Sequence, residues 1–426
     1  MIKSIRTPKR NGLMMVKKLE RNIITGLDIG TSKVVALVGE VAADGTIEII
    51  GIGKHPSRGL KRGVVVDIEA TVNSIQRAVQ EAELMAGCEV TSVYTGIAGS
   101  HIRSLNSHGI VAIKDQEVSQ ADVERVIDAA KAVAIPADQK IIHILPQEFI
   151  IDNQGSIREP VGMSGVRLEA RVHIVTGAVS AAQNIAKCVR RCGLEVSDII
   201  LEQLASSHAV LTEDEKELGV CLVDIGGGTT DIAIFYEGAI QYTAVIPIAG
   251  DQVTNDIAMA LRTPTKSAES IKLTHGCAIP EFVNTSQTID VMSVNERTGR
   301  KISTKVLADV ILARYEELFT LVKNELRRSG YENLLAAGIV LTGGASKVKG
   351  AIELAESCFE LPVRLGSVQQ IAGLTEVVDN PSLATGVGLL MHGVKQQFDS
   401  HLGSPSVGEG AMGVWNRMKQ WFTVNF

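Results

Sequence analysis

One turn of the sequence combines a carboxylate, a glycine, two hydroxyls and a lysine in a way that suits phosphate binding. In "LDIGTSK" the apolar run ends at Asp28, and Gly30, Thr31, Ser32 and Lys33 follow. Backbone N–H groups beside a glycine can approach phosphate oxygens without a side chain in the way, and hydroxyls add further donors. A lysine adds a point charge near terminal phosphates. The turn therefore predicts a phosphate-binding loop.

A second turn repeats this plan later in the chain. In "LVDIGGGTTD" the apolar run ends at Asp224, and the next residues are Gly226, Gly227, Gly228, Thr229 and Thr230. We expect Asp28 and Asp224 to face each other across a cleft. Such carboxylates suit Mg²⁺, which keeps most of its waters and bridges to phosphates. One Gly-rich hairpin alone could be only a tight turn, but two with an aspartate at the same place are harder to explain so.

Three further features could complete a nucleotide site. In "IVLTGGAS", Gly343 and Gly344 would let a flat base lie on the backbone, and in "PIAGDQVTND", Gly250 offers another point of close backbone approach. On a predicted helix, Glu269 and Lys272 are three residues apart and share a face. Taken singly, the glycines also fit a plain turn, and the charged pair also fits a surface ion pair.

The elements that must position these residues form an α/β pattern that occurs twice. Around the first turn, apolar strands are predicted at 23–29, 33–41 and 46–53. The same order of strand, Asp-Ile-Gly turn, strand and strand returns from Gly219 onward. A duplication of this size predicts two similar α/β halves.

Helices and further strands are predicted between the turns. Asp67 is expected to begin a helix that Gly87 ends, and Ser119 with Asp122 forms a capping pattern for a helix that Pro136 stops. The apolar stripe expected for the first helix is Ile68, Val72, Ile75, Val79 and Leu84. The other predicted elements are strands at 92–97, 141–151, 168–176 and 338–341, and helices from Ala181 and at 254–261, 265–274 and 303–329.

Composition limits the class of protein. With 426 residues, 45% hydrophobic, the chain is globular and long enough for two to four domains of about 150 residues. Its net charge of −6 provides no basic field to recruit nucleic acid. No apolar run approaches the ~18–20 residues of a membrane-spanning helix. The six cysteines include no CxxC pair, which favours reduced packing residues in a cytosolic protein.

The two ends differ from the body of the chain. Residues 1–22 form a basic lead-in that is expected to be disordered, and the Gly-, Ser- and Pro-containing stretch 399–411 is typical of a flexible linker. If 412–426 is a helix, its apolar residues fall on one face and its basic residues on the other, which suits a membrane surface. The alternative is a helix docked on its own domain or on a partner. The residues expected at the membrane are Val414, Trp415, Arg417, Met418, Lys419, Trp421, Phe422 and Phe426.

In this order the motifs resemble the actin superfamily of actins, chaperone ATPases and sugar kinases. "LDIGTSK", "VDIGGGTTD", "IAGDQVTND" and "LTGGAS" would be its two phosphate segments, its interdomain segment and its adenosine segment. The resemblance implies ATP and Mg²⁺ as ligands, and a polar side chain on a connecting helix that orients the attacking water. Glu202 has the spacing before Asp224 that is seen in bacterial actins, with Gln203 as the fallback. An ordinary polar helix residue is the alternative.

Longer stretches resemble the FtsA family of bacterial cell-division proteins. The likeness includes "LPQEFIIDNQGSIREPVGMSGVRLEARVHIVTG" and "LAAGIVLTGGASKVKG" and runs from about Asn22 to the C-terminus. It implies an α/β fold of duplicated actin/ribonuclease-H-like halves around a nucleotide cleft, with an inserted α+β subdomain called 1C and a C-terminal amphipathic helix. The implied division is 1A at 23–100 and 178–215 with 350–398, 1C at 101–177, 2A at 216–245 and 321–349, and 2B at 246–320.

The resemblance implies a function as well. The protein would polymerise on the cytoplasmic face of the inner membrane at the division septum, as a peripheral protein and at most a slow ATPase. Subdomain 2B would bind the C-terminal tail of the tubulin-like FtsZ, with Arg300 and Arg314 as candidate contacts, and 1C would contact later divisome proteins and neighbouring subunits. Three alternatives stay open: a small-molecule kinase, for which no substrate base is evident, a cell-shape actin and a pilus-assembly actin-like protein.

Overall fold

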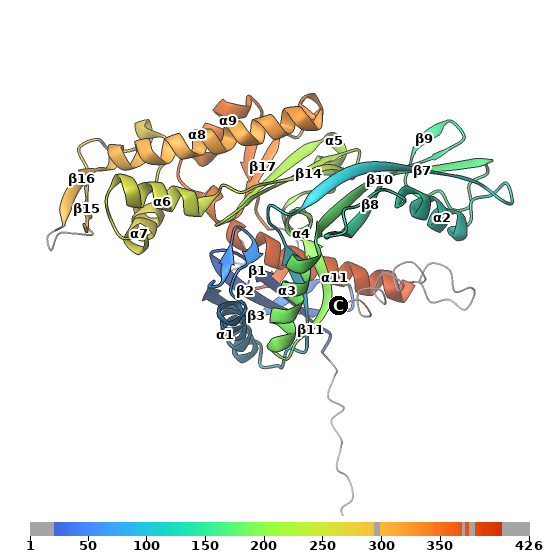
Figure 1. The fold of residues 1–426 in the computed structure, drawn as a ribbon, viewed down its shortest axis with the longest axis horizontal. Coiled ribbons are helices and arrows are strands. Elements are labelled where there is room, and N and C mark those ends of the chain that lie inside the picture. The colour runs from blue at the N-terminus through green and yellow to red at the C-terminus, as the bar shows by residue number, and fades with distance from the viewer. Residues whose placement is uncertain (1–20, 294–298, 369–370, 375–379, 403–426) are drawn as a thin grey trace, which may run out of the picture.

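The computed structural model describes residues 21–293, 299–368, 371–374 and 380–402. It contains two α/β lobes and a smaller α/β unit beside them (Figure 1). In this view the first lobe, with the blue strands, lies below the second, which carries the long orange helix α8 (Thr304–Ser329). The smaller unit, in cyan and green, extends to the right.

The sheet of the first lobe has the strand order β11-β6-β1-β2-β3-β19. β1, β2 and β3 are joined as antiparallel neighbours, and β6 and β11 continue the sheet parallel to β1. The first two strands have the predicted bounds, whereas the third runs on to Pro56. The strands are β1 (Ile23–Ile29), β2 (Lys33–Val41), β3 (Ile47–Pro56), β6 (Ser92–Ile97), β11 (Glu195–Leu201) and β19 (Ile371–Gly373).

The sheet of the second lobe repeats this arrangement. Its order is β14-β13-β12-β17-β18, with the first three strands antiparallel and the last two parallel to β12. Strand for strand, the order and directions match those of β3, β2, β1, β6 and β11, so the predicted duplication is confirmed. The strands are β12 (Val220–Ile225), β13 (Thr230–Tyr236), β14 (Ala239–Ile246), β17 (Ile339–Thr342) and β18 (Val363–Leu365).

The helix α1 (Ile68–Ala86) packs unusually close to β3. Asp67 caps it by accepting a hydrogen bond from Ala70 N at 3.0 Å. A Cβ on Gly53 would lie 1.8 Å from the carbonyl oxygen of Ala78, so glycine permits the approach. The predicted burial of the apolar stripe is wrong at Leu84, which is 86% exposed. Leu84 lies about 180° around the helix from Ile75, and Ala82 and Ala86 continue the buried stripe at that end instead.

The smaller unit is a four-stranded antiparallel sheet in the order β7-β10-β8-β9. Helix α2 (Gln120–Ala130) packs against it and begins at the predicted capping box of Ser119 and Asp122. Although inserted in the first lobe's sequence, the unit contacts β14 of the second lobe, where Ser104 Oγ donates to Thr243 O at 3.0 Å. Its strands are β7 (Arg103–Ala112), β8 (Gln139–Ile151), β9 (Gln154–Ile157) and β10 (Arg167–Ala178).

Several bounds differ from the predictions. The helix predicted at 254–261 begins at Gly250, and the last described helix continues to Leu402, so 399–402 is helical rather than part of a linker. The predicted membrane helix 412–426 and residues 1–20 of the lead-in lie outside the described residues. The remaining α-helices described are α3 (Val179–Arg191), α4 (Glu202–Val210), α5 (Glu213–Leu218), α6 (Gly250–Ala260), α7 (Thr265–His275), α9 (Ala351–Phe359) and α11 (Ala384–Leu402).

Short elements complete the described chain. Two-residue strands β4 (Leu60–Lys61) and β5 (Val64–Val65) pair with each other, as do β15 (Thr288–Val291) and β16 (Arg300–Ser303) at the far end of the second lobe. None of the helices in the described ranges is both long and apolar enough to cross a bilayer.

Candidate functional site

A cleft of about 1130 Å³ lies between the two lobes and brings the predicted site residues together. The two Asp-containing turns line it from opposite lobes, since each follows the equivalent strand, β1 or β12. Thr230 is the exception: it is buried outside the cleft and donates to Ile248 O at 2.8 Å. The predicted residues that line the cleft are Asp28, Gly30, Thr31, Ser32, Lys33, Glu202, Asp224, Gly226, Gly227, Gly228, Thr229, Gly250, Glu269, Lys272, Gly343 and Gly344.

The two turns have the same backbone closure and touch each other. Gly30 N donates to Lys33 O at 3.1 Å, and Gly226 N donates to Thr229 O at 3.0 Å. A Cβ on Gly228 would lie 2.6 Å from Thr31 Oγ1, which is too close for any side chain. Glycine at 228 therefore permits the close approach of the two turns where the lobes meet.

Buried carboxylates crowd the floor of the cleft. Burial raises the pKa of Asp28 to about 6, with Asp224 adding to the rise and Lys33 opposing it. Burial, together with the charge of Asp224, raises the pKa of Asp231 to about 8. Burial also raises the pKa of Glu202 well above its usual value, and Asp28, Asp231 and Asp224 add to the rise. A cation placed among these groups would stabilise their charged forms.

The residues present fit a hydrated Mg²⁺ held by phosphates better than a metal held by protein alone. Within the described parts of the chain, no three or more His, Cys, Asp or Glu side chains are grouped as a metal site. Mg²⁺ usually needs only one or two carboxylates when phosphates and waters supply its other ligands. Asp231 Oδ1 is buried with no hydrogen-bond partner, so the floor has acceptor capacity to spare.

Lys33 bridges the first turn to a segment that sequence reasoning missed. Its Nζ donates to the carbonyl oxygen of Ser382, and burial lowers the pKa of Lys33 to about 8 against the opposing charge of Asp28. Gly343 N donates to Pro381 O at 3.2 Å, so the same segment also contacts the second lobe. A signal was available, because Asn380 followed by Pro381 is a typical helix start.

Glu202 is the first residue of α4 and lines the cleft, whereas Gln203 does not. Gly96 on β6 leaves room for it, since a Cβ there would lie 2.8 Å from Glu202 Cγ. The side chain of Gln203 is buried, and neither its Oε1 nor its Nε2 has a partner. The geometry therefore favours Glu202 over Gln203 as the polar group that faces a ligand.

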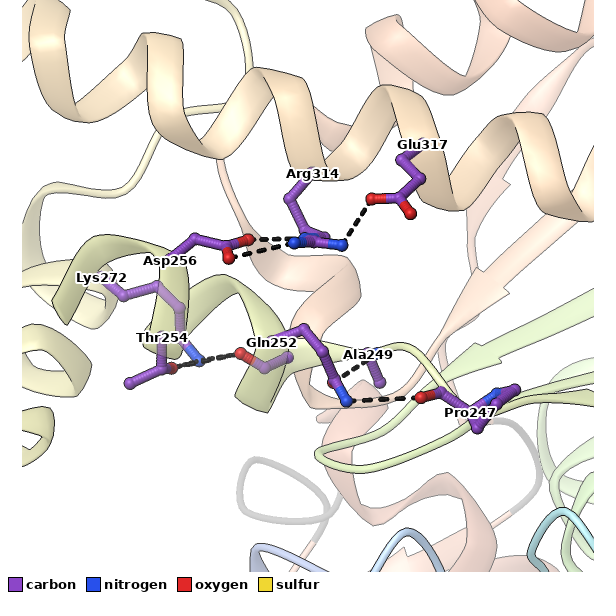
Figure 2. A network of polar contacts seen from close by, with 9 residues as sticks. Pro247, Ala249, Gln252, Thr254, Asp256, Lys272, Arg314 and Glu317 are labelled. Atoms are coloured by element: carbon purple, nitrogen blue, oxygen red, sulfur yellow. Dashed lines mark hydrogen bonds and ion pairs between the residues drawn. The ribbon is translucent and has the colours of Figure 1, made fainter. Parts of the chain in front are cut away.

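Lys272 connects α7 to Thr254 on α6 (Figure 2), and Glu269 pairs with Lys272. Lys272 Nζ lies 2.7 Å from Glu269 Oε2 and donates to Thr254 Oγ1 at 2.8 Å and to Gly250 O at 3.1 Å. Gly250 N in turn donates to Gly226 O at 3.1 Å. The start of α6 is thus tied to the second phosphate-type turn on one side and to α7 on the other.

Gly343 and Gly344 form a turn that lines the cleft next to Asp224. Gly343 has a φ of +85°, and a Cβ there would lie 2.4 Å from Asp224 Oδ1. Tyr315 on α8 holds the turn in place by donating from its hydroxyl to Ala345 O at 2.6 Å. The backbone of this turn is open to the cleft, as binding of a flat base requires.

Arg300 and Arg314 lie outside the cleft and are already engaged. Arg314 contacts Asp256 through Nε at 2.5 Å and through a second nitrogen at 3.0 Å, and it also contacts Glu317 (Figure 2). Arg300 donates to Leu261 O. An acidic peptide would have to share these arginines with partners within the lobe.

Comparison with known proteins adds a family context. A family model described as cell division protein FtsA matches residues 221–388, and one described as the SHS2 domain inserted in FTSA matches 99–176. A relative from Pseudomonas aeruginosa named cell division protein FtsA is 66% identical over 409 residues, covering 95% of this chain and 98% of its own. One of the same name from Escherichia coli is 46% identical over 420 residues, covering 97% and 100%.

Solved structures show the same fold at much lower identity. The PilM–PilN type IV pilus biogenesis complex matches with a TM-score of 0.64 at 17% identity, covering 87% of this chain and 98% of that one. MreB5 of Spiroplasma citri bound to ADP matches with a TM-score of 0.53 at 16% identity, covering 90% and 99%. At these identities the likeness establishes the actin-like fold alone.

Proposed function

The chain belongs to the FtsA family of cell-division proteins, and from this premise we propose that it is an ATP-binding actin-like protein that anchors FtsZ filaments to the inner membrane. The observation that supports ATP binding is the pair of equivalent turns, one per lobe, that face each other across one cleft with Asp28 and Asp224 at their bases. Family membership supports the division role. The likeness to a pilus complex concerns the fold only. A small-molecule kinase would need a catalytic base for its substrate, and the sequence contains no motif for one.

In this proposal the backbone of the two turns receives the phosphates. The N–H groups of Thr31 and Ser32 in the first turn and of Gly227 and Gly228 in the second donate to phosphate oxygens, and the adenine lies on Gly343 and Gly344. Lys33 exchanges its hydrogen bond to Ser382 for the terminal phosphates, where its charge is worth more in the buried cleft than in water. Asp28 and Asp224 would hold Mg²⁺, which neutralises phosphate charge when bound.

Glu202 is the proposed water-positioning group. Its position at the start of α4 puts it on the cleft, and its raised pKa keeps it protonated more readily than a surface glutamate. Glu202 makes hydrolysis chemically possible, and we expect at most slow turnover. ATP that contacts both lobes would favour the closed arrangement of the cleft and a polymer-competent population.

Membrane attachment is assigned to 412–426 and FtsZ binding to 246–320, including Arg300 and Arg314. A single short helix with two basic residues binds a bilayer weakly, but a polymer presents many such helices and their binding adds up. The unit at 101–177 is assigned to contacts with later divisome proteins and neighbouring subunits. The location we propose is therefore the cytoplasmic face of the inner membrane, at the septum.

Co-sedimentation with anionic liposomes tests this function. The full chain with Mg²⁺ and ATP is expected to pellet with lipid and to carry FtsZ with it. A full chain with Trp415→Ala and Trp421→Ala is expected to stay in the supernatant, whereas Asn416→Ala with Thr423→Ala on the polar face is the matched control. If the unaltered chain neither pellets nor recruits FtsZ, the proposal is wrong, and sugar-dependent ATP turnover would point to the kinase instead.

A further inference from the structure

Two hydroxyls from the first lobe contact the carboxylate of Asp224 in the second. Ser206 on α4 donates from Oγ to Asp224 Oδ2 at 2.6 Å. Thr385, in the first turn of α11, has its Oγ1 3.0 Å from Ser206 Oγ and 3.4 Å from Asp224 Oδ2. These contacts cross the interface between the lobes next to the second turn.

The number of protons limits how the two hydroxyls can bond to the carboxylate and to each other. A serine hydroxyl carries one proton, and Ser206 uses it on the carboxylate. Its oxygen is then free to accept, so the single proton of Thr385 can go to Ser206 Oγ at 3.0 Å or to Asp224 Oδ2 at 3.4 Å. When Thr385 donates to Ser206, the hydrogen bonds form a chain from Thr385 to Ser206 to Asp224. Each bond in such a chain polarises the next, and bonds to a charged acceptor are the strong ones.

The packing of the two helices explains why the hydroxyls meet. Gly388 lies one turn after Thr385, and a Cβ there would lie 1.8 Å from the carbonyl oxygen of Ala205. Only glycine allows α11 to approach α4 this closely. The residue after Ala205 is Ser206, so the close approach brings the two hydroxyls together beneath Asp224.

The other oxygen of Asp224 is also constrained. Gly343 lies against Oδ1, where a Cβ would be 2.4 Å away. With Oδ2 held by the hydroxyls and Oδ1 bounded by this turn, the carboxylate has one orientation. Burial raises the pKa of Asp224, and the hydrogen bonds from Ser206 and Thr385 oppose that rise.

We propose that Ser206 and Thr385 are positioning residues that orient Asp224 toward the metal of a bound Mg²⁺–ATP. This inference rests on the proposed function, because it presumes that the cleft takes Mg²⁺–ATP. It adds two residues that no phosphate-type motif contains. It also gives α11 a direct connection to the carboxylate that we assign to the metal.

The experiment compares ATP affinity with Mg²⁺ and with EDTA, in the full chain and in four variants. Ser206→Ala and Thr385→Val remove the hydroxyls at nearly constant size, Thr385→Ser keeps the hydroxyl, and Ser207→Ala is the control. Ser207 is buried on the same helix but donates to Leu204 O at 2.7 Å, away from Asp224. We expect Ser206→Ala and Thr385→Val to weaken Mg²⁺–ATP binding about tenfold or more, with metal-free ATP binding unchanged.

The outcomes separate this inference from the proposed function. If Thr385→Ser and Ser207→Ala bind Mg²⁺–ATP as the unaltered chain does, while the other two variants lose only the metal-dependent part, the inference is supported. It is overturned if Ser206→Ala and Thr385→Val bind Mg²⁺–ATP normally, lose affinity equally in EDTA, or melt well below Ser207→Ala. If the unaltered chain binds no Mg²⁺–ATP, the proposed function itself is overturned.

Discussion

Lys33 donates a hydrogen bond to the carbonyl oxygen of Ser382, which lies 349 residues later in the chain. The contact joins the first phosphate-type turn to the segment that begins α11 and that also accepts a hydrogen bond from Gly343 N. Lys33 therefore connects the first phosphate-type turn to the turn at Gly343 and Gly344. The connection runs through the segment at Pro381 and Ser382, which belongs to neither motif. A ligand that draws Lys33 toward phosphates must release Ser382.

Replacing Lys33 is expected to weaken ATP binding selectively. Lys33→Ala removes a buried positive charge from the cleft and should lower ATP affinity by about 10- to 100-fold, while Lys33→Arg keeps the charge and loses less. Lys114→Ala, an exposed change in the smaller unit, is the control. Titration calorimetry measures the equilibrium affinity for ATP. An unchanged affinity in Lys33→Ala would show that Lys33 does not contribute to ATP binding.

Alanine at Gly228 should separate the lobes. Its Cβ would lie 2.6 Å from Thr31 Oγ1, so the two turns must move apart. We expect a loss of about 1–3 kcal/mol in unfolding free energy and a marked loss of ATP affinity. The control is Gly299→Ala, where the nearest atom to a new Cβ is Val291 O at 3.6 Å. Equal effects of the two changes on denaturant unfolding would contradict this account.

The buried carboxylates make stability fall as pH rises. Because burial and Asp224 raise the pKa of Asp231 to about 8, the folded protein holds a proton there that the unfolded chain has lost above its ordinary pKa of 3.8. Stability should therefore decline between about pH 4 and pH 8. Asp231→Asn removes the effect and should raise Tm by about 4 °C or more at pH 8, but much less at pH 5.

The control for this prediction is the exposed Asp138→Asn, which should leave the pH profile unchanged. Thr229 Oγ1 donates to Asp231 Oδ2 at 2.9 Å, and the amide oxygen of an asparagine can accept that bond. If Tm drops at every pH in Asp231→Asn, the folded protein stabilises the ionised carboxylate of Asp231, and the prediction is contradicted.

Buried histidine gives the opposite dependence at acidic pH. Burial lowers the pKa of His143 to about 4 from 6.5, despite the opposing charge of Asp198, and its Nε2 accepts from Leu201 N at 2.9 Å. The folded protein keeps His143 neutral while the unfolded chain takes up a proton. This contribution is present above pH 6.5 and is lost as pH falls toward 4, by up to about 3 kcal/mol.

His143→Gln, whose amide oxygen can accept the same hydrogen bond, should flatten the acidic limb of the pH profile. The exposed His275→Gln is the control and should retain it. Urea unfolding at pH 4.5, 5.5 and 6.5 measures the difference. If both variants lose stability with acid as steeply as the unaltered chain, another group is responsible for that limb.

Local signals in the sequence predicted much of this fold. Asp28 and Asp224 at the ends of equivalent strands predicted the duplication, because the turn chemistry is contained within a few residues. Asp67 and the Ser119 capping box predicted where helices begin for the same reason. The burial of Leu84 was predicted wrongly because it lies five positions after Val79, about 140° away around the helix, and Ala82 and Ala86 continue the buried stripe instead.

The rest depends on contacts between distant segments. Ser206 and Thr385 meet Asp224 only because Gly388 brings α11 onto α4, and no local pattern contains that distance. Thr230 follows four residues that line the cleft, yet strand β13 turns it away. Sequence spacing identified the turns, and the packing of the lobes determined which of their residues line the cleft.

A crystal structure of the full chain with Mg²⁺ and a non-hydrolysable ATP analogue tests the central claim most directly. The account predicts the phosphates between the turns at 28–33 and 224–230, with Asp28 and Asp224 on either side of the metal and the base at Gly343 and Gly344. A nucleotide bound elsewhere, or phosphates that these two carboxylates do not flank, would contradict it.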